Sequence, residues 1–158
     1  MCCLFGLIDY GHRLTGRQKG QLMRSLALES EARGTDAAGV AYNSGGKLHI
    51  CKHPGPAHKL NLFVPEDAYV VMGHSRMTTQ GKAKFNRNNH PFAGKVPGTK
   101  FALAHNGVLY NDMTLRRSRA LPDTRIETDS YVAVQLIEQQ RALTPASLKT
   151  MAEAVEGS

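Results

Sequence analysis

The sequence predicts an α+β domain in which helices pack on layers of β-sheet. Two observations point to this class. Short apolar runs typical of strands occur between longer stretches in which apolar residues recur at helical spacing. Glycine-containing turns separate several of the strands, as they do in β-hairpins. The 158 residues are the length of one domain, and 41% apolar residues are compatible with a packed core.

The N-terminal part of the chain predicts a strand followed by a helix. Residues 3–10 carry an apolar run that favours a buried strand. Thr15 and Gln18 have the spacing of a capping box, which opens a helix that runs to about Arg33, and Gly34 is a typical C-terminal stop. Four apolar residues of this helix recur at helical spacing and are expected to form its buried face: Leu22, Met23, Leu26 and Ala27.

Further strands are expected at residues 40–42, 47–52, 68–73 and 101–104. Ser44-Gly45-Gly46 joins the first two of these as a hairpin. Residues 81–99 are polar and rich in Gly, Asn and Pro, so we expect a long loop that is either functional or mobile. Residues 108–110 are expected to continue the last strand across a hairpin. One helix then opens at Asp129, and another starts with Pro145 at its first position.

Lysine and arginine give the chain a formal net charge of +7, which favours anionic partners. The basic residues are nevertheless scattered, and no aromatic residues interleave with them as a nucleic-acid stacking surface requires. We therefore expect a solvated basic surface and no nucleic-acid partner.

The three cysteines include no CxxC pair, so they indicate neither a disulfide framework nor a zinc site, and they suit a reducing compartment. Asp9 interrupts the first apolar stretch, which argues against a signal peptide. No apolar stretch approaches the length of a membrane span. A soluble, cytoplasmic protein without metal, cofactor or membrane contact is the expectation.

Cys2 becomes the N-terminal residue if Met1 is removed, and its small side chain permits that removal. An N-terminal cysteine carries a nucleophilic thiol beside an α-amine, whose reference pKa of about 7.7–8.0 lets it accept a proton near neutral pH. The strand at residues 3–10 would hold this terminus in place, whereas most termini fray. A small apolar side chain is the commoner role of such a cysteine, so downstream residues decide between the two interpretations.

Polar residues follow two of the predicted strands and open the helix after them. Arg76 offers a planar guanidinium to a carboxylate, with a surface ion pair as the alternative. The amide of Asn106 and the backbone N–H of Gly107 can converge on one oxygen, as an oxyanion hole requires, although His-Asn-Gly is also an ordinary turn. Asp129 would either cap its helix or hold a substrate ammonium group.

Six motifs in combination resemble the class II glutamine amidotransferase domain, whose members are N-terminal-nucleophile hydrolases. The motifs are Met-Cys at the start, Arg-Gly-x-Asp-Ala-Ala-Gly at 33–39, Gly-His-Ser-Arg-x-x-Thr-x-Gly at 73–81, Asn-His-Pro-Phe at 89–92, His-Asn-Gly at 105–107 and Glu-Thr-Asp at 127–129. The resemblance covers the chain from Cys2 to the helix after Asp129. It implies a four-layer αββα sandwich for residues 1–158.

The resemblance also implies roles for individual residues. Cys2 matches the nucleophile, whose own α-amine serves as its base. Asn106 and Gly107 match the oxyanion hole. His90 matches a supporting histidine that orders loops beside the site, and Arg33 matches an arginine that supports the nucleophile strand.

The residues that match the substrate site are Arg76 for the α-carboxylate of glutamine, Thr79 in the same loop, and Asp129 for the α-ammonium group. The function this implies is a glutamine amidohydrolase that releases glutamate and ammonia through a Cys2 thioester, with ammonia passed to an unidentified acceptor. Two alternatives stay open. One is an inactive domain that binds glutamine, as a regulatory domain would. The other is a basic binding module, and its only support is the net positive charge of the chain.

The chain departs from the family pattern at two points that concern its partners. Met77 stands where the sugar-isomerising synthases have Trp, which speaks against that acceptor. The family domain continues beyond this length, so C-terminal strands of the sandwich are expected to be missing, which would leave an exposed sheet edge. A synthase domain often follows in the family, so a synthase domain or subunit is a candidate partner.

Overall fold

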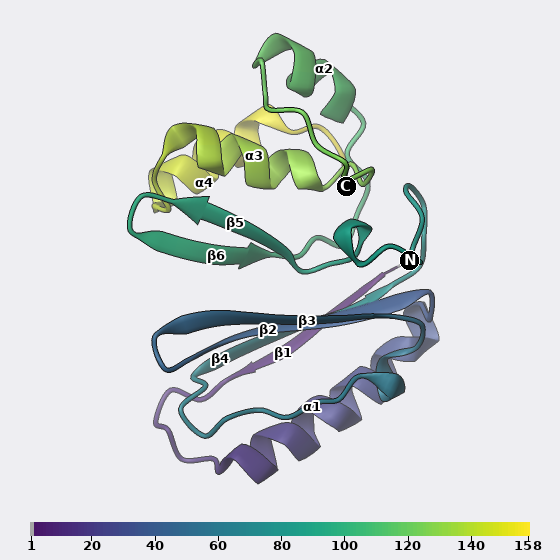
Figure 1. The fold of residues 1–158 in the computed structure, drawn as a ribbon, viewed down its shortest axis with the longest axis vertical. Helices are drawn as coiled ribbons and strands as arrows, with labels where there is room; N and C mark the ends of the chain where they lie inside the picture. Colours follow the sequence, from purple (N-terminus) through teal and green to yellow (C-terminus); the bar gives the residue numbers. More distant parts are fainter. Residues whose placement is uncertain (1) are drawn as a thin grey trace.

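Two antiparallel β-sheets lie face to face in the computed structural model, and helices cover their outer sides (Figure 1). The structure describes residues 2–158. One sheet has four strands in the order β1-β4-β2-β3, and the other consists of β5 and β6. The strands are β1 (Cys3–Ile8), β2 (Ala37–Ser44), β3 (Lys47–Pro54), β4 (Val70–Arg76), β5 (Phe92–Val96) and β6 (Thr99–Leu103). The helices are α1 (Gly16–Ser30), α2 (Asp112–Ser118), α3 (Tyr131–Gln140) and α4 (Pro145–Ala154).

Each sheet has its own helical layer. α1 packs on the four-stranded sheet through β1 and β4, whereas α3 packs on β5, and both α2 and α4 contact α3. The buried residues between α1 and its sheet include Met23, Ala27, Val40 and Val71. Those between the second sheet and α3 include Phe92, Phe101, Val134 and Ile137. The order helix, sheet, sheet, helices confirms the predicted α+β class and the four-layer αββα sandwich.

The buried face of α1 differs from the predicted one. Met23 and Ala27 are fully buried as expected, but Leu22 and Leu26 are 47% and 37% exposed. The buried residues of the helix also include Lys19, together with Gly20 and Ser30. Lysine counts as a polar residue in hydrophobic periodicity. The sequence pattern therefore leaves Lys19 out of the buried face and includes Leu22 and Leu26 instead.

Lys19 is fully buried because the interior satisfies its charge and its hydrogen-bonding capacity. Its Nζ lies 3.1 Å from Oδ2 of Asp9 and donates to the carbonyl oxygens of Glu66 and Ala68 at 2.6 and 2.7 Å. Asp9 also accepts the backbone N–H of Arg13, and chiefly this bond lowers the pKa of its carboxyl to about 2. The pair fastens the end of β1 to α1.

Replacing Lys19 with alanine is expected to lower the free energy of unfolding by about 3–5 kcal/mol, since the buried carboxylate of Asp9 and two carbonyl oxygens lose their partner. Urea denaturation followed by circular dichroism measures the change. Lys149→Ala is the control, because Lys149 is 76% exposed in an ion pair with Glu153 and should contribute at most about 0.5 kcal/mol. Equal losses in the two variants would contradict the assignment.

β1 is half-buried rather than buried as predicted. Phe5 and Leu7 pack against the core beside α1, but Leu4 and Ile8 are 49% and 50% exposed. Successive side chains of a strand point to opposite faces, so Leu4 and Ile8 lie on the face away from α1. β1 pairs only with β4 and therefore forms an edge of its sheet.

Three further segments differ from the predicted elements. The stretch expected as a loop contains β5, which forms a hairpin with β6. Helix α2 is not among the predicted elements. Residues 108–110 do not continue β6: Leu109 forms a bridge with Gly157, and the Tyr110 N–H donates to the Glu156 carbonyl at 2.8 Å. The β5–β6 hairpin is local, but the polar composition of the surrounding stretch conceals it. The partners of Leu109 and Tyr110 are distant in sequence, so local pattern carries no signal for them.

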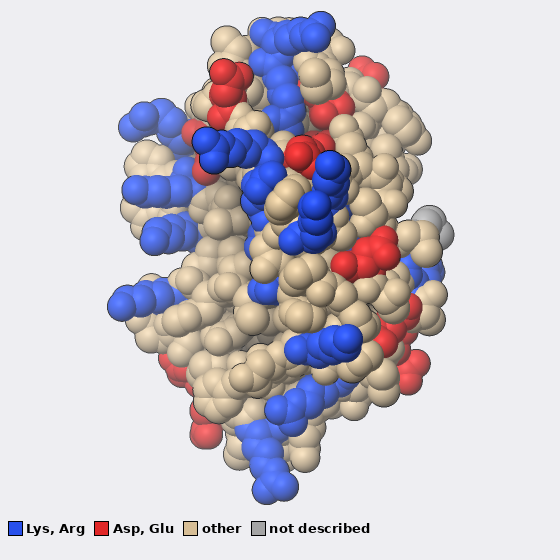
Figure 2. Space-filling model, turned by 45° about the vertical axis from the view of Figure 1, so that its right-hand side comes forward, with Lys and Arg blue, Asp and Glu red and all other residues tan. Residues whose placement is uncertain are grey.

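The charged residues are dispersed as the sequence suggests. Figure 2 shows lysine and arginine side chains spread over one face of the molecule, with acidic side chains among them. This agrees with a solvated basic surface. Within the described residues, none of the helices combines the length and the hydrophobicity that crossing a bilayer requires.

Candidate functional site

Cys2 lies beside Arg76 where β1 begins and β4 ends. The register pairs Cys3 with Ser75, so the next position along brings Cys2 next to Arg76, at the end of the sandwich where the N-terminus is drawn (Figure 1). The Cys2 side chain is half-buried, and its Sγ donates to the carbonyl of Met77 at 3.4 Å. Met1 lies outside the described residues. Its predicted removal therefore stays a prediction.

Arg76 is a buried cation held by neutral oxygen atoms. It is 3% exposed; Nη1 donates to Oδ1 of Asn89 at 2.6 Å, and Nη2 donates to the carbonyls of Gln80 and Gly81. Burial lowers the pKa of its guanidinium, while the nearby charges of Cys2 and several carboxylates oppose that shift. Among residues 2–158 no carboxylate forms an ion pair with it. A ligand carboxylate is a group that could complete this environment.

The motif at residues 33–39 supports the loop after β4 through Gly34 and Asp36. The backbone N–H of Asp36 donates to the Arg76 carbonyl at 3.0 Å, and its Oδ2 accepts the N–H of Thr78 at 2.7 Å. A Cβ on Gly34 would lie 2.5 Å from the carbonyl carbon of Arg76, so only glycine allows this approach. Asp36 lies within this motif, but its residue type and spacing do not mark it as a functional residue in the sequence.

Asp129 faces the same region, and Gln80 connects it to Arg76. Asp129 is 2% exposed, and its Oδ2 accepts the backbone N–H of Leu109 at 2.6 Å. Its own N–H donates to Oε1 of Gln80 at 3.1 Å, while the Gln80 carbonyl accepts from Arg76. The N-cap of α3 is Ser130, without a side-chain cap bond, so the capping alternative for Asp129 is wrong.

Asn106 and Gly107 lie in an irregular turn after β6. The side chain of Asn106 is exposed, and no residue within 2–158 hydrogen-bonds to its amide, which leaves the amide free for a ligand. A Cβ on Gly107 would lie 1.6 Å from the carbonyl oxygen of Ser158. Glycine is therefore required at 107 by close packing, independently of any role in catalysis.

Two histidines are buried between the sheets. His74 is 0% and His90 is 4% exposed, and their ring centroids lie 4.3 Å apart. Burial lowers the pKa of His74 to about 4 and holds that of His90 well below its usual value. Nδ1 of His74 and both ring nitrogens of His90 have no hydrogen-bond partner. His90 thus packs against the ring of His74, and its supporting role stays a prediction. The role of His74 is not apparent from the sequence.

Lowering the pH from about 6.5 to about 4 is expected to destabilise the fold. The pKa of His74 falls from 6.5 in the unfolded chain to about 4 in the folded one, so only the unfolded chain takes up this proton between those values. Stability is full above pH 6.5, and His74 alone accounts for a loss of about 3 kcal/mol across the window. Urea denaturation at several pH values measures it. The slope should be shallower in His74→Gln; identical slopes would contradict this account.

The remaining two predicted residues make fewer contacts. Arg33 and Thr79 are exposed, and neither side chain forms a hydrogen bond or ion pair within residues 2–158. Arg33 ends the short 3₁₀ turn before β2, and Thr79 lies in the loop between β4 and β5. Their predicted supporting and substrate-binding roles stay predictions.

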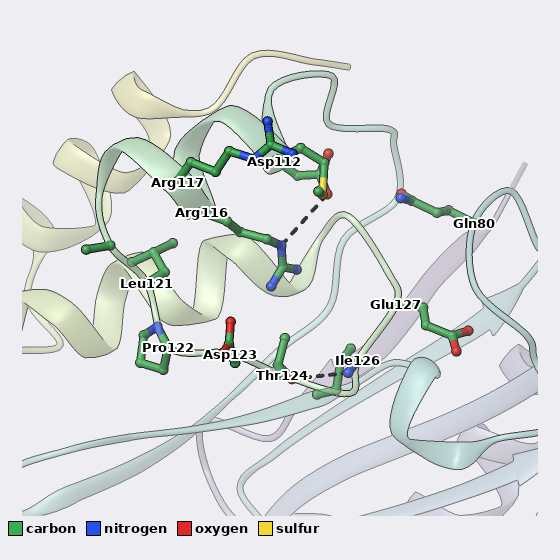
Figure 3. Close-up of a pocket in the computed structure, with 12 residues that line it drawn as sticks. Gln80, Asp112, Arg116, Arg117, Leu121, Pro122, Asp123, Thr124, Ile126 and Glu127 are labelled. Carbon is green, nitrogen blue, oxygen red and sulfur yellow. Dashed lines mark hydrogen bonds and ion pairs between the residues drawn. The ribbon is translucent and has the colours of Figure 1, made fainter.

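A cleft of about 590 Å³ lies beside the loop that follows β4 (Figure 3). Gln80 and Glu127 line one part of it, and α2 contributes Arg116. The Arg116 guanidinium lies 3.9 Å from the carboxylate of Asp112 and donates to Oε1 of Gln135 at 2.8 Å. Neither Cys2 nor the turn at Asn106 lines this cleft. It borders the candidate site but does not contain the nucleophile.

The functional groups of the candidate site are suited to acyl transfer. A thiol, a buried guanidinium, a buried carboxylate and a free amide come from four separate segments of the chain, and the first three are linked by the contacts described above. Among the described residues no group of three or more His, Cys, Asp or Glu side chains is arranged to hold a metal ion.

Comparisons with known proteins agree on one family. The sequence model described as glutamine amidotransferases class-II matches residues 23–156. A glutamine–fructose-6-phosphate aminotransferase (isomerizing) of Listeria innocua is 32% identical over 163 aligned residues, which cover 100% of this chain and 26% of that protein. The protein of the same name from Bacillus subtilis is 32% identical over 138 residues, or 85% of this chain and 22% of that protein. This chain thus spans about a quarter of the length of such relatives.

Two solved structures share the fold. The structure of the allosteric regulatory enzyme of purine biosynthesis matches 100% of this chain and 34% of its own, with a TM-score of 0.74 and 22% identity. Glutamine phosphoribosylpyrophosphate amidotransferase from Bacillus subtilis matches 99% of this chain and 33% of its own, with a TM-score of 0.70 and 20% identity. At such identities the likeness shows the fold alone.

Proposed function

The chain belongs to the class II glutamine amidotransferases, and from this premise we propose that it hydrolyses the side-chain amide of L-glutamine to glutamate and ammonia. One observation carries the proposal: Cys2 adjoins Arg76, a buried cation without an ion-pair partner among residues 2–158. Such a cation attracts the α-carboxylate of a free amino acid and leaves the other end of that amino acid near the thiol.

In the proposed complex glutamine is held by its amino-acid end. Arg76 binds the α-carboxylate and Asp129 the α-ammonium group, while Thr79 contributes from the loop between them. The hydrogen bonds of Gln80 to both Arg76 and Asp129 support a fixed spacing between these charges. Only a free α-amino acid carries both groups, so these contacts would discriminate against glutaminyl residues within peptides.

The reaction proceeds through a thioester. The Cys2 sulfur attacks the side-chain carbonyl carbon, and the thiol proton passes to the free α-amine of Cys2. Asn106 and Gly107 stabilise the oxyanion, an effect on the order of 3–4 kcal/mol per donor. The C–N bond breaks as the α-amine returns the proton to the departing ammonia. Water then hydrolyses the γ-glutamyl thioester to glutamate and frees the thiol, while Arg33 and His90 serve as supporting residues.

The ammonia released in the proposed reaction requires a partner that accepts it. We propose that residues 1–158 form one amidotransferase domain and that ammonia passes to a synthase domain or subunit. The relatives' name, glutamine–fructose-6-phosphate aminotransferase, gives one acceptor for those proteins. Met77 stands where the sugar-isomerising synthases have Trp, which argues against that acceptor here, and we assign none.

Binding of glutamine without turnover is a second candidate, and one contact favours it. The Ser158 carbonyl oxygen lies so close to Gly107 that a Cβ there would meet it at 1.6 Å. This oxygen crowds the Cβ side of the residue that the reaction would need as an oxyanion donor.

Intact-mass measurement with a diazoketone analogue of glutamine separates the two candidates. The enzyme should lack Met1, carry one adduct that maps to Cys2, and release glutamate from glutamine. A chain that keeps Met1 and releases no glutamate would instead be a binding domain, and dialysis with labelled glutamine would then measure its affinity. Labelling of Cys3 or Cys51 in place of Cys2 would overturn the assignment of the nucleophile.

A further inference from the structure

The turn that carries Asn106 and Gly107 belongs to no helix or strand. It spans residues 104–108, between the end of β6 and the bridge at Leu109. Backbone outside regular structure has no ladder of hydrogen bonds to fix it, so its shape depends on the few groups that bind it. The proposed oxyanion hole therefore requires anchors elsewhere in the fold.

His74 on β4 supplies one anchor. Its Nε2 lies 3.2 Å from the carbonyl oxygen of His105, the residue immediately before Asn106. A carbonyl can only accept, so Nε2 carries the hydrogen and donates it. The ring is 0% exposed and its Nδ1 has no partner, so this single hydrogen bond is the only one the imidazole makes within residues 2–158.

The opposite end of the turn is anchored by Asp129, whose Oδ2 accepts the Leu109 N–H at 2.6 Å. A third link joins the two: Nδ1 of His105 lies 3.0 Å from Oγ of Ser130, which in turn lies 3.4 Å from Oδ1 of Asp129. Hydrogen bonds thus hold the turn at the carbonyl of His105, at the side chain of His105 and at the N–H of Leu109, which follows the turn.

β4 ties this turn to the carboxylate-binding group. His74 and Arg76 are two positions apart on the strand, so their side chains leave the same face of the sheet. A regular strand fixes that separation. The strand beside Cys2 therefore carries both the cation that would hold one end of glutamine and the donor that holds the turn facing the other end.

We propose that His74 is a positioning residue for the oxyanion hole: through the His105 carbonyl it holds the turn so that the Asn106 amide and the Gly107 N–H face the carbonyl that Cys2 attacks. This rests on the proposed function. His74 touches no reacting atom. Its loss displaces two donors whose strongest contact forms only in the transition state, so it lowers kcat with little change in KM.

The test compares two substitutions of His74 with one of its neighbour. His74→Leu removes the donor, whereas His74→Gln places an amide N–H near the position of Nε2. Ser75→Ala is the matched control: Ser75 is equally buried on the same strand, but it bonds Ser30 on the opposite face at 2.5 Å. We expect His74→Leu to lose about 10²-fold in kcat with KM nearly unchanged, and His74→Gln to recover most of it. A merely structural role would give no rescue by glutamine and no split between kcat and KM.

A second measurement isolates the transition state. The open-chain form of L-glutamate γ-semialdehyde, in equilibrium with its cyclic imine, is attacked at the aldehyde carbon by the Cys2 sulfur while the thiol proton passes to the α-amine, and the oxygen of the resulting hemithioacetal occupies the proposed hole. His74→Leu should weaken binding of the aldehyde by about the factor lost in kcat and leave binding of L-glutamate unchanged. Equal weakening of both ligands would overturn the proposal.

Hydrogen exchange decides the positioning role without activity. Amides of residues 105–110 should exchange faster in His74→Leu than in wild type, but not in His74→Gln or Ser75→Ala. If wild type releases no glutamate, the proposed function fails, and exchange still reports whether His74 holds the turn. Unchanged exchange of residues 105–110 in His74→Leu would overturn the inference even in an active enzyme.

Discussion

Replacing Cys2 with alanine is expected to abolish glutamine hydrolysis, lowering kcat by roughly 10⁴-fold or more, as removal of a nucleophile does in other acyl-transfer enzymes. The thioester cannot form without the sulfur, whereas Arg76 and Asp129 remain in place to bind the amino-acid end. A coupled assay for glutamate measures turnover, and calorimetry with L-glutamate checks that binding persists.

The other two cysteines provide matched controls. Cys3 is half-buried on β1 and Cys51 is exposed on β3. Cys3→Ala and Cys51→Ala should both retain most of the activity. Equal loss from Cys3→Ala would mean that the wrong sulfur has been chosen.

Replacing Asp129 with asparagine should reduce kcat/KM by about 10²–10³-fold, mainly through KM, because a buried partner of the substrate ammonium group loses its charge. The substitution preserves the fold: the asparagine Oδ1 can still accept the Leu109 N–H that Asp129 accepts at 2.6 Å. Steady-state kinetics with glutamine and with 4-carbamoylbutanoate, which lacks the α-amine, measure the effect. The preference for glutamine should nearly vanish in the variant.

Asp112→Asn is the control for a buried carboxylate outside the site. Asp112 is 7% exposed and lies 3.9 Å from Arg116 at the neighbouring cleft. Its substitution should leave kcat/KM within about 2-fold of wild type, since it changes no contact to the proposed substrate. If Asp129→Asn keeps the preference for glutamine, the ammonium group is bound elsewhere.

The sequence was least informative where one element depends on a distant one. β5 falls within a polar stretch that reads as loop, and it becomes a strand because β6 pairs with it and α3 covers it. Lys19 interrupts an apolar pattern, yet it is buried because Asp9 and two carbonyls surround its Nζ. β6 follows β5 directly, but α3, which covers β5, and the carbonyls of Glu66 and Ala68 are distant in sequence and cannot be identified from a local window.

The candidate site divides in the same way. Cys2, Arg76 and Asp129 stand in motifs that can be recognised one by one, and the structure links them through β1, β4 and Gln80. Gln80 itself looks like an ordinary loop residue, because its function depends on contacts with two segments at once. The residue at 107 shows the limit of motif reasoning, because the packing of Ser158 requires glycine there as much as an oxyanion hole would.

The sequence by itself determined the α+β class, the family, and the identity of the nucleophile and substrate-binding candidates, because residue types in short fixed patterns carry that information. Only the tertiary structure decided which groups meet: Asn89 and Gln80 on Arg76, Leu109 on Asp129, and His74 on the carbonyl of His105. Such contacts follow from strand register and from the stacking of two sheets. These fix distances between segments that are far apart along the chain.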